Sequence, residues 1–469
     1  MIQKYDVPGP RYTSYPTVPA WKNLPDLAVW PEKWSYALSN EIKAQAGCSA
    51  GAIYVHIPFC ESLCTYCGCN TRITRNRTVA APYVDTILKE WDLVRRNLVE
   101  HGALANLQTP YVLAELHLGG GTPTFLTPEE LDHLVSGLFQ HARLAPDAEL
   151  SVEADPRVTT RAHLETLARL GFRRLSLGIQ DFDPEVQELV NRVQTRDMVA
   201  RVVDQARELG FTSINFDLIY GLPKQCLESI AYTIRVVEGL RPDRIAFYSY
   251  AHVPWIKSGQ RKFTEADLTT GATKRSLYEL GRMRLESVGY QEIGMDHFAL
   301  PTDGLARAVQ AKTLHRNFMG YIERHVSPLI GLGVSAIGDA WTTFVQNEKT
   351  LETYTNKVAA GHLPIFRGHV LTEEDLFFRK HILALMTRFE TSWLEKSTAS
   401  RLLAFAKPAL TKLAEDGIIE WSAADGPFVT NHCRVTDFGR PFLRNVCMAF
   451  DPTLAGAADP NRPRFSQTI

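Results

Sequence analysis

The stretch Tyr54-Val-His-Ile-Pro-Phe-Cys60-Glu-Ser-Leu-Cys64-Thr-Tyr66-Cys67-Gly-Cys69-Asn70 decides how the rest of the chain is interpreted. Four of the eight cysteines lie between Cys60 and Cys69, directly after an apolar, β-branched run that predicts a strand. Thiolates spaced this closely are typical ligands of a soft metal or of a metal cluster. We therefore expect an enzyme whose chemistry takes place at this turn.

Three kinds of site compete for these cysteines. A structural zinc site usually takes two ligand pairs separated by a longer loop, and no second pair follows within reach in the sequence. A disulfide is disfavoured because residues 1–15 lack the apolar segment of a secretory signal, so we expect a reducing, cytoplasmic environment. An iron–sulfur cluster takes cysteine thiolates at short spacing. The spacing therefore favours a cluster over zinc.

Composition sets the broad class of the protein. A chain of 469 residues should divide into two or three domains. Its formal net charge of -1, with no run of Lys or Arg, lacks the positive field that nucleic-acid binding usually needs. No segment reaches about 18 consecutive apolar residues, so we expect no membrane span.

Downstream of the first strand, strands and helices alternate along the sequence. The predicted strands are Ala52–Phe59, Ala114–Gly120, Glu149–Asp155, Arg174–Gln180, Ser213–Tyr220 and Arg244–Ala251. The predicted helices are Ala80–Val99, Pro128–Gln140, Arg161–Leu170, Arg196–Leu209 and Leu227–Leu240. This alternation predicts right-handed βαβ crossovers and a parallel sheet in an α/β fold. Six such units suffice for a partial (β/α)6 TIM-like barrel or for an open doubly-wound sheet.

Polar residues at the strand ends favour the barrel, whose active sites lie at the carboxyl ends of the strands. Acidic residues in such positions can instead cap the following helices. Asp155 and Asp181 fit capping well. Glu153, Gln180 and Asp217 lie further inside their strands and fit it poorly, so we expect these three to face the site.

The barrel is flanked by two further regions. In residues 1–50 we expect an arm followed by one amphipathic helix near Pro31–Ala46. Both should lie over the barrel and its site. The arm is expected to be a strap that packs on the main domain, in preference to a lid that covers the site. Residues 51–365 contain the barrel and a connecting extension of weaker periodicity. Residues 366–469 predict a mainly helical, winged-helix-like domain without a basic recognition helix, so we expect it to pack against the barrel.

The spacing C-x3-C-x2-C resembles that of the radical S-adenosylmethionine enzymes. In these, three cysteines hold a [4Fe–4S] cluster whose fourth iron binds the amino and carboxylate groups of S-adenosylmethionine. The resemblance implies that Cys60, Cys64 and Cys67 are ligands and that Cys69 is not. The segment Gly119-Gly-Gly-Thr122-Pro-Thr124, one strand later, is similar to the glycine-rich segment that receives the amino group of this cofactor.

Several blocks together resemble one family, the oxygen-independent coproporphyrinogen III oxidases (dehydrogenases) of haem biosynthesis. The likeness extends from the N-terminal arm to the last residues. The blocks are Pro8–Pro16, Cys67–Asn70, Gly119–Thr124, Gln180–Phe182, Val190–Arg192, Asp217–Pro223, Gly294–Phe298, Leu314–Phe318 and Arg464–Gln467.

The resemblance implies one [4Fe–4S] cluster and two S-adenosylmethionine molecules. The implied contacts of the first molecule are Tyr54, Tyr66, Gly120, Glu153 and Ile337. Those of the second are Gly121, Thr122, Gln180, Arg192, Asp217 and Ala251. Tyr66 and Leu118 stand where the family has Phe and often Trp, but both keep a large apolar body.

The implied reaction converts two propionates of coproporphyrinogen III to vinyl groups, giving protoporphyrinogen IX and carbon dioxide. A reduced cluster gives one electron to the sulfonium, and the resulting 5′-deoxyadenosyl radical takes a hydrogen from the propionate β-carbon. The expected electron donor is a low-potential flavodoxin or ferredoxin, at roughly −400 mV. Arg11 and Arg316 are the candidates for binding the substrate carboxylates.

Two related functions remain as alternatives, a haem-binding chaperone of the same superfamily and a radical methyltransferase of anaerobic haem degradation. The chaperones generally lack the Pro8–Pro16 arm and have an aromatic residue at the position of Cys69. Both features of this chain therefore favour the oxidase, which we expect to be a monomer.

Overall fold

The computed structural model describes residues 1–21, 27–44, 50–394, 403–422, 430–454 and 465–468. Within this part of the chain, twelve strands form one sheet, in the order β16-β15-β14-β13-β1-β4-β5-β6-β7-β8-β10-β9. Its parallel centre consists of β1 (Gly51–Ile57), β4 (Tyr111–Gly120), β5 (Ala142–Ala154), β6 (Arg174–Gln180), β7 (Ser213–Tyr220) and β8 (Arg244–Ser249).

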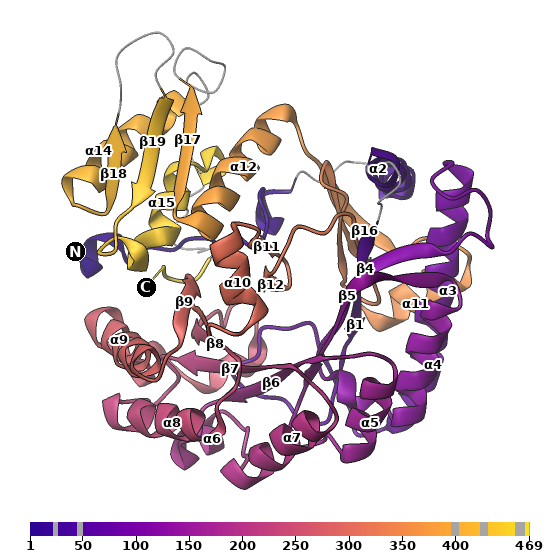
Figure 1. The fold of residues 1–469 in the computed structure, drawn as a ribbon, viewed down its shortest axis with the longest axis horizontal. Coiled ribbons are helices and arrows are strands. Elements are labelled where there is room, and N and C mark those ends of the chain that lie inside the picture. Colours follow the sequence, from indigo (N-terminus) through magenta and orange to yellow (C-terminus); the bar gives the residue numbers. More distant parts are fainter. Residues whose placement is uncertain (22–26, 45–49, 395–402, 423–429, 455–464, 469) are drawn as a thin grey trace.

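Helices cover the outside of these six strands (Figure 1). They are α3 (Ala80–Glu100), α4 (Pro128–Phe139), α5 (Arg161–Arg169), α7 (Arg196–Glu208) and α8 (Leu227–Leu240), with the short α6 (Pro184–Leu189) before α7. From β1 to β8, each strand lies beside the next one in the chain, whereas a doubly-wound sheet reverses its direction at a switch point. The predicted partial (β/α)6 barrel is therefore confirmed. It stays open, because the outermost described strands, β16 and β9, pair at one side only.

Alternation along the strands separates a polar barrel interior from an apolar outer face. In β6, Leu175, Leu177 and Ile179 are buried beneath the helices. Ser176 lies on the opposite face, because successive side chains of a strand point to opposite sides. Helices begin at threonine caps, such as the capping box of Thr127 before α4. The apolar faces of the helices therefore cover the sheet, and the polar faces of the strands remain for a site.

The region 255–365, predicted as an extension of weak periodicity, supplies most of the strands at both ends of the sheet, and the end strand β16 runs on beyond it. β13 (Leu329–Leu332) pairs in parallel with β1, and β14 (Ile337–Asp339), β15 (Thr343–Asn347) and β16 (Ile365–Val370) follow it as antiparallel strands. At the other end, α9 (Gly271–Ser287) precedes β9 (Gln291–Gly294) and β10 (His297–Ala299), and β10 pairs with β8. Beyond them lie α10 (Gly304–Ala311) and a hairpin of β11 (His315–Asn317) and β12 (Gly320–Ile322). Strands this short carry too few residues for a clear periodic signal.

The N-terminal helix and the arm pack in different places. Helix α2 (Trp30–Ala44) contacts α3, β15 and β16, with Trp30 and Trp34 against the glycines of β16 and β14. It therefore lies at the periphery beside α3, as Figure 1 shows, and not over the strand ends as predicted. Residues 45 and 46 of the predicted helix lie outside the described residues.

The arm forms a strap, and it packs on the C-terminal region. Tyr5, Tyr12 and Tyr15 belong to the hydrophobic core of that region. Backbone hydrogen bonds join Gly9 to Ser466 and Thr468 to Val7, and the two ends of the chain lie close together in Figure 1. The arm thus packs as an extended segment against the last described residues, while Arg464 of the family-like tail lies outside them.

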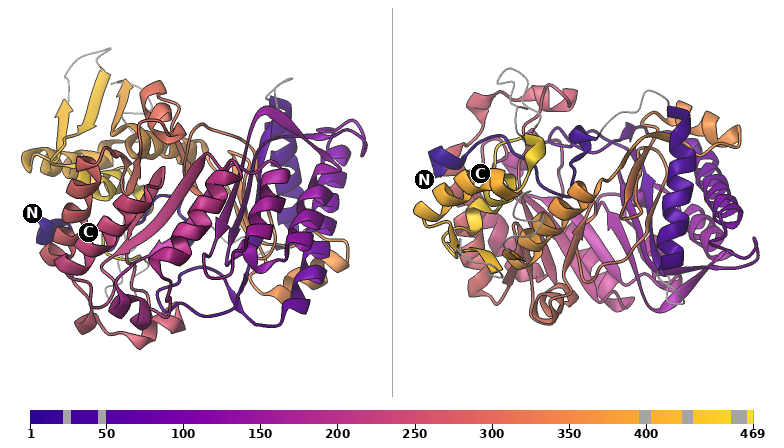
Figure 2. Two further views of the ribbon diagram at one scale, coloured as in Figure 1. Left: turned by 60° about the horizontal axis from the view of Figure 1, so that its bottom comes forward. Right: turned by 90° about the horizontal axis from the view of Figure 1, so that it is seen from above.

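The C-terminal region contains α12 (Glu373–Arg388), β17 (Glu390–Leu394), α14 (Lys407–Glu415), β18 (Ile419–Ser422), β19 (Thr430–Val435) and α15 (Leu443–Ala449). Its described strands form a sheet in the order β17-β19-β18, seen beside the barrel in Figure 2. Helix α14 ends just before Gly417, which has the left-handed conformation that ends many helices, and β18 follows it. No helix in the described part of the chain is both long and apolar enough to cross a bilayer.

Buried Glu90 on α3 joins three later parts of the chain. Its carboxylate accepts hydrogen bonds from Gly333 N–H (2.8 Å), Asn347 Nδ2 (2.6 Å) and the Tyr354 hydroxyl (2.6 Å), which belong to the turn after β13, to β15 and to α11 (Leu351–Ala359). Burial raises the pKa of Glu90 to about 7, against these hydrogen bonds. The folded state therefore retains a proton on Glu90 that the unfolded state releases nearer its ordinary pKa.

We predict that Glu90→Ala lowers the free energy of unfolding by about 3 kcal/mol, because three buried donors lose their acceptor. In the wild type, the Glu90 contribution makes this free energy fall as pH rises from about 4.5 to about 7, since the folded state binds the extra proton in that window. Urea denaturation across this pH range measures both effects. Glu100→Ala, at an exposed position of the same helix, is the control, and an equal loss in the two variants would contradict the prediction.

Candidate active site

A cavity of about 530 Å³ lies at the carboxyl ends of the parallel strands, beneath the cysteine turn. This volume is within the usual range of small-molecule sites, about 300–1,000 Å³. It is lined by eleven of the residues predicted from the sequence, namely Cys60, Cys64, Tyr66, Cys67, Gly120, Gly121, Thr122, Glu153, Gln180, Arg192 and Asp217. The fold thus brings together residues that are spread over more than a third of the chain.

Three predicted cofactor contacts do not line this cavity. The Tyr54 ring lies on β1, stacked on His117, and its hydroxyl is 3.0 Å from His56 Nδ1. Ile337 lies on β14 and packs in the cluster of Trp21, Phe344 and Leu371. Ala251 follows the end of β8 and is partly buried. The roles of these three residues stay predictions.

The two predicted substrate arginines also lie outside the cavity lining. Arg11 donates to the carbonyl of Ser249 and lies 3.5 Å from an Asp296 carboxylate oxygen. Arg316 is buried on β11, its guanidinium 4.5 Å from the centre of the Tyr321 ring. Its Nε and Nη1 have no hydrogen-bond partner within the described part of the chain.

The cysteine turn is a loop closed at its base by two short strands. Pro58 follows β1, and β2 (Phe59–Cys60) pairs with β3 (Arg72–Ile73). Side chains from elsewhere hold the outer part of the loop: Lys257 donates to Cys69 O (2.9 Å) and Gln260 donates to Tyr66 O (2.9 Å). The loop is therefore fixed on the barrel even though it has little secondary structure of its own.

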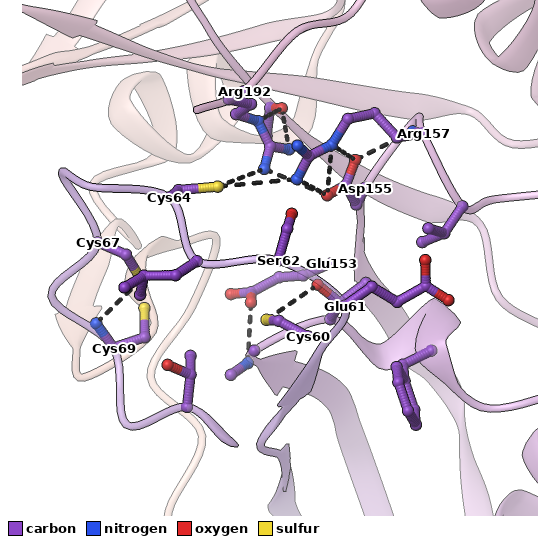
Figure 3. A pocket seen from close by; sticks show the side chains of 18 of the residues that line it. Cys60, Glu61, Ser62, Cys64, Cys67, Cys69, Glu153, Asp155, Arg157 and Arg192 are labelled. Atoms are coloured by element: carbon purple, nitrogen blue, oxygen red, sulfur yellow. Dashed lines mark hydrogen bonds and ion pairs between the residues drawn. The ribbon is translucent and has the colours of Figure 1, made fainter. Parts of the chain in front are cut away.

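The three predicted ligand cysteines share the cavity wall and have different partners (Figure 3). Cys60 Sγ lies 3.4 Å from the Thr122 hydroxyl, and Cys67 Sγ accepts a hydrogen bond from Cys69 N–H at 3.4 Å. Within the described residues, no three His, Cys, Asp or Glu side chains lie close enough to bind a single metal ion. Three thiols spread around one cavity instead suit a larger iron–sulfur cluster, whose usual ligands are thiolates.

Cys67 and Cys69 form an asymmetric pair. A hydrogen bond from the Cys69 thiol lowers the pKa of Cys67 to about 6, while the same interaction raises the pKa of Cys69 well above its usual value. Cys67 is thus the more acidic thiol of the pair. This direction favours Cys67 over Cys69 as a ligand, because the thiolate is the coordinating form.

The glycine segment at the end of β4 lies directly against the cysteine turn. A Cβ atom at Gly121 would come within 2.7 Å of the Pro58 carbonyl, and one at Gly120, whose φ is +113°, would clash with the His56 ring. Only glycine allows this approach, since any side chain would push the two loops apart. The segment therefore forms a narrow wall of the cavity beside Cys60.

Two carboxylates, on the strands β5 and β7 that flank β6, differ in their affinity for protons. Removal from water raises the pKa of Glu153, but the hydrogen bond and charge of His117 and the N–H of Gly120 (2.9 Å) hold it below its usual value. Burial and the charge of Glu153 raise the pKa of Asp217 to about 6, despite hydrogen bonds from Asn215 and Ser176. Near neutral pH, Glu153 is a fixed anion and Asp217 titrates.

Gln180 has an unusual backbone at the end of β6. Its φ is 68°, in the left-handed region, and the pairing of β6 with β7 shifts register between Gly178 and Gln180. A bulge of this kind redirects a side chain at the end of a strand, and non-glycine residues with positive φ concentrate at functional sites. The irregularity turns Gln180 into the cavity.

The sequence reasoning missed several lining residues, including Arg157, Ser176 and Tyr248, and it interpreted Asp155 as a helix cap. Asp155 accepts a hydrogen bond from Arg157 N–H (3.0 Å) in the loop after β5, but the N-cap of α5 is Thr160. The Asp155 carboxylate also binds the guanidinium groups of Arg157 and Arg192. The position of Arg157 in the loop directly after β5 was a usable signal, because loops at this end of a barrel carry the site.

The partial barrel, the cysteine turn after its first strand and the cavity at the strand ends define a radical S-adenosylmethionine enzyme. Residues 54–237 match the family model described as Radical SAM superfamily. The chain belongs, more narrowly, to the family of oxygen-independent coproporphyrinogen III oxidases, as the similarity to curated relatives shows. Membership in this superfamily implies a [4Fe–4S] cluster and S-adenosylmethionine as cofactors.

The similarity covers the whole chain. It is 39% identical over 476 residues to the oxygen-independent coproporphyrinogen III oxidase of Pseudomonas aeruginosa, covering 100% of this chain and 98% of that relative. The Escherichia coli relative is 39% identical over 481 residues, and the Helicobacter pylori one 36% over 475, with the same coverage. The solved structure of coproporphyrinogen III oxidase from Escherichia coli, described as a radical SAM enzyme, superposes with a TM-score of 0.83 and 37% identity, over 94% of this chain and 97% of that chain.

We predict that Cys60→Ala, Cys64→Ala and Cys67→Ala each abolish the iron–sulfur cluster, whereas Cys69→Ser retains it. The three substitutions remove thiolate ligands, whereas serine at position 69 keeps a hydroxyl that can still donate to Cys67. Iron and acid-labile sulfide per chain, measured after anaerobic reconstitution, test the assignment. The control is Cys226→Ser, because Cys226 is exposed and lies after β7, away from the cysteine turn in the sequence. Loss of iron in Cys69→Ser would show that Cys69 is a ligand.

Proposed function

We propose that the protein catalyses the oxygen-independent decarboxylation of two propionate groups of coproporphyrinogen III to vinyl groups, giving protoporphyrinogen IX. The observation that carries this proposal is the identity of 36–39%, over the full length of the chain, to relatives named for that activity. Each conversion releases carbon dioxide and removes one hydrogen atom and one further electron from the propionate. When bound, the cluster and S-adenosylmethionine supply the one-electron chemistry of this oxidation.

Cys60, Cys64 and Cys67 hold the cluster in this proposal, and the cavity beside them holds two S-adenosylmethionine molecules. Three thiols around one cavity support the first assignment. Support for the second is that lining residues from both predicted sets share this cavity. The first set is Tyr54, Tyr66, Gly120, Glu153 and Ile337, and the second is Gly121, Thr122, Gln180, Arg192, Asp217 and Ala251.

The charged residues of the cavity would each bind a different polar group of S-adenosylmethionine. Glu153 is a fixed anion on the cavity wall and suits the cationic amino group of the first molecule. Arg192 is a buried cation and suits a carboxylate, while Asp217 accepts hydrogen bonds from ribose hydroxyls once it is ionised.

Arg11 and Arg316 bind carboxylates of the substrate in this proposal. The substrate has four carboxylates, and a guanidinium is the side chain best suited to bind them in pairs of hydrogen bonds. The buried Nε and Nη1 of Arg316, which have no partner within the described residues, support a ligand at this position. Arg11 lies close by, since both arginines affect the pKa of Asp296.

The remaining parts of the proposal concern the surroundings of the enzyme. Its electron donor is a low-potential flavodoxin or ferredoxin, and the enzyme acts in the cytoplasm as a monomer. Residues 1–50 form the arm and its helix, residues 51–365 the barrel with its extension, and residues 366–469 the C-terminal domain. The sheet itself continues to Val370, at the end of β16.

The decisive experiment is an anaerobic assay of the reconstituted protein with coproporphyrinogen III, S-adenosylmethionine and a strong reductant. We expect protoporphyrinogen IX, carbon dioxide and 5′-deoxyadenosine, and none of these from Cys64→Ala. Tight stoichiometric haem binding without protoporphyrinogen would identify a haem chaperone instead. A methylated, ring-opened tetrapyrrole formed from haem would identify a methyltransferase. Either result would overturn the proposal.

We predict that the affinity for S-adenosylmethionine rises with pH through about 6, because Asp217 becomes an anionic acceptor as it loses its proton. Asp217→Asn should weaken binding about tenfold above this pH, the usual effect of losing one charged hydrogen bond, and should remove this step of the pH profile. Equilibrium dialysis of the reconstituted protein measures both. Asp204→Asn, at an exposed position on α7, is the control, and an unchanged pH profile in Asp217→Asn would contradict the assignment.

A further inference from the structure

Cys64 differs from the other two proposed ligand cysteines in its surroundings. Its sulfur accepts hydrogen bonds from two guanidinium groups, Arg157 Nη2 and Arg192 Nη1, each at 3.7 Å. Among the residues that the structure describes, the Cys60 sulfur has the Thr122 hydroxyl as its hydrogen-bond partner, and the Cys67 sulfur has Cys69. Figure 3 shows both guanidinium groups converging on the Cys64 sulfur.

One carboxylate fixes both arginines in this position. Arg157 binds Asp155 through Nε (3.0 Å to Oδ1 and 3.1 Å to Oδ2) and Nη2 (2.6 Å to Oδ2), and Arg192 Nη1 lies 3.2 Å from the same Oδ2. Burial raises the pKa of Asp155, but Arg192 and Arg157 hold it below its usual value, so the carboxylate is ionised. Two cations and one anion therefore leave a net positive charge beside the sulfur.

Of the two arginines, Arg157 is the one whose guanidinium makes no hydrogen bond outside this group within the described residues. Arg192 also donates to the Gly178 carbonyl through Nε, at 2.9 Å, and faces the proposed cofactor cavity as a buried side chain. The hydrogen bonds of the Arg157 guanidinium go to Asp155 and Cys64, and its side chain is 20% exposed, against 8% for Arg192. Asp155 thus holds the Arg157 guanidinium in a position from which it donates to the Cys64 sulfur.

We propose that Arg157, held by Asp155, is a positioning residue that raises the reduction potential of the cluster through the Cys64 sulfur. The inference rests on the proposed function only in taking Cys64 as a cluster ligand. On reduction, one electron from a low-potential donor enters the cluster and adds one negative charge to it. A hydrogen-bond donor and a positive charge at a coordinating sulfur stabilise this reduced form more than the oxidised one. Arg157 stays protonated in both states, so no proton moves with the electron.

Arg157→Gln tests the proposal because it removes the charge and keeps a side chain of similar reach. The midpoint potential of the reconstituted cluster is measured by a mediated titration followed by electron paramagnetic resonance. We expect a more negative midpoint, with the equilibrium constant for reduction lowered about tenfold, which is about 59 mV for a one-electron couple. Arg157→Lys should recover most of this loss, since it restores the charge.

The control is Arg161→Gln, four residues later, whose guanidinium is solvent-exposed and bound to Glu165 and Glu208. It should leave the midpoint potential unchanged. Arg157→Met provides a second neutral variant in case Arg157→Gln does not bind iron. Iron and sulfide content are measured for every variant, so that a change of potential is compared only between fully loaded proteins.

Three results would overturn the inference. An unchanged midpoint in a fully loaded neutral variant would do so directly. An unchanged midpoint together with weaker S-adenosylmethionine or substrate binding would instead assign Arg157 to a ligand carboxylate. Loss of iron in both neutral variants would assign it a structural role. A wild-type protein that binds no cluster would contradict the proposed function itself, before any variant is compared.

Discussion

Parallel pairing of six strands in chain order is the constraint on which the site depends. Because the strands point the same way, their carboxyl ends meet at one edge, and Gly121 of one strand end lies against Pro58 of its neighbour. This contact allows no side chain at Gly121. The cysteine turn, the glycine wall and the carboxylates of β5 and β7 therefore reach one cavity, although no two of them are adjacent in sequence.

The cavity combines charges of both signs at short range. Glu153 is stabilised as an anion by His117 and Gly120, while Arg192 is a buried cation bound to Asp155. Each charge is matched by a fixed partner from the protein, which is the condition for keeping ions away from bulk water. Such a wall offers preorganised partners to a zwitterionic cofactor, whose amino and carboxylate groups would otherwise be costly to desolvate.

Much of this arrangement follows from the sequence. The strands Arg174–Gln180 and Ser213–Tyr220 have their predicted bounds, because long, regularly alternating segments carry a strong signal. Position within the strands also predicted that Glu153 and Asp217 line the site, as they do. These predictions succeeded because parallel strands have a fixed polarity and a fixed side-chain alternation. The helix caps predicted at Asp155 and Asp181 were wrong, because Thr160 and Asp183 are the N-caps of α5 and α6.

The failures come from tertiary contacts that no local pattern encodes. Arg157 reaches Cys64 only because the loop after β5 folds back, and α2 lies beside α3 because its two tryptophans fit over glycines of distant strands. The arm shows the same dependence on the far end of the chain: Arg444 binds the carbonyls of Gly9 and Pro10 as well as that of Gln467. Arg444 is separated from Pro10 and Gly9 by 434 and 435 residues in sequence, so two distant segments must meet before the arm can pack. Contacts of such long sequence separation form slowly, and we therefore expect the arm to dock late in folding, after the barrel.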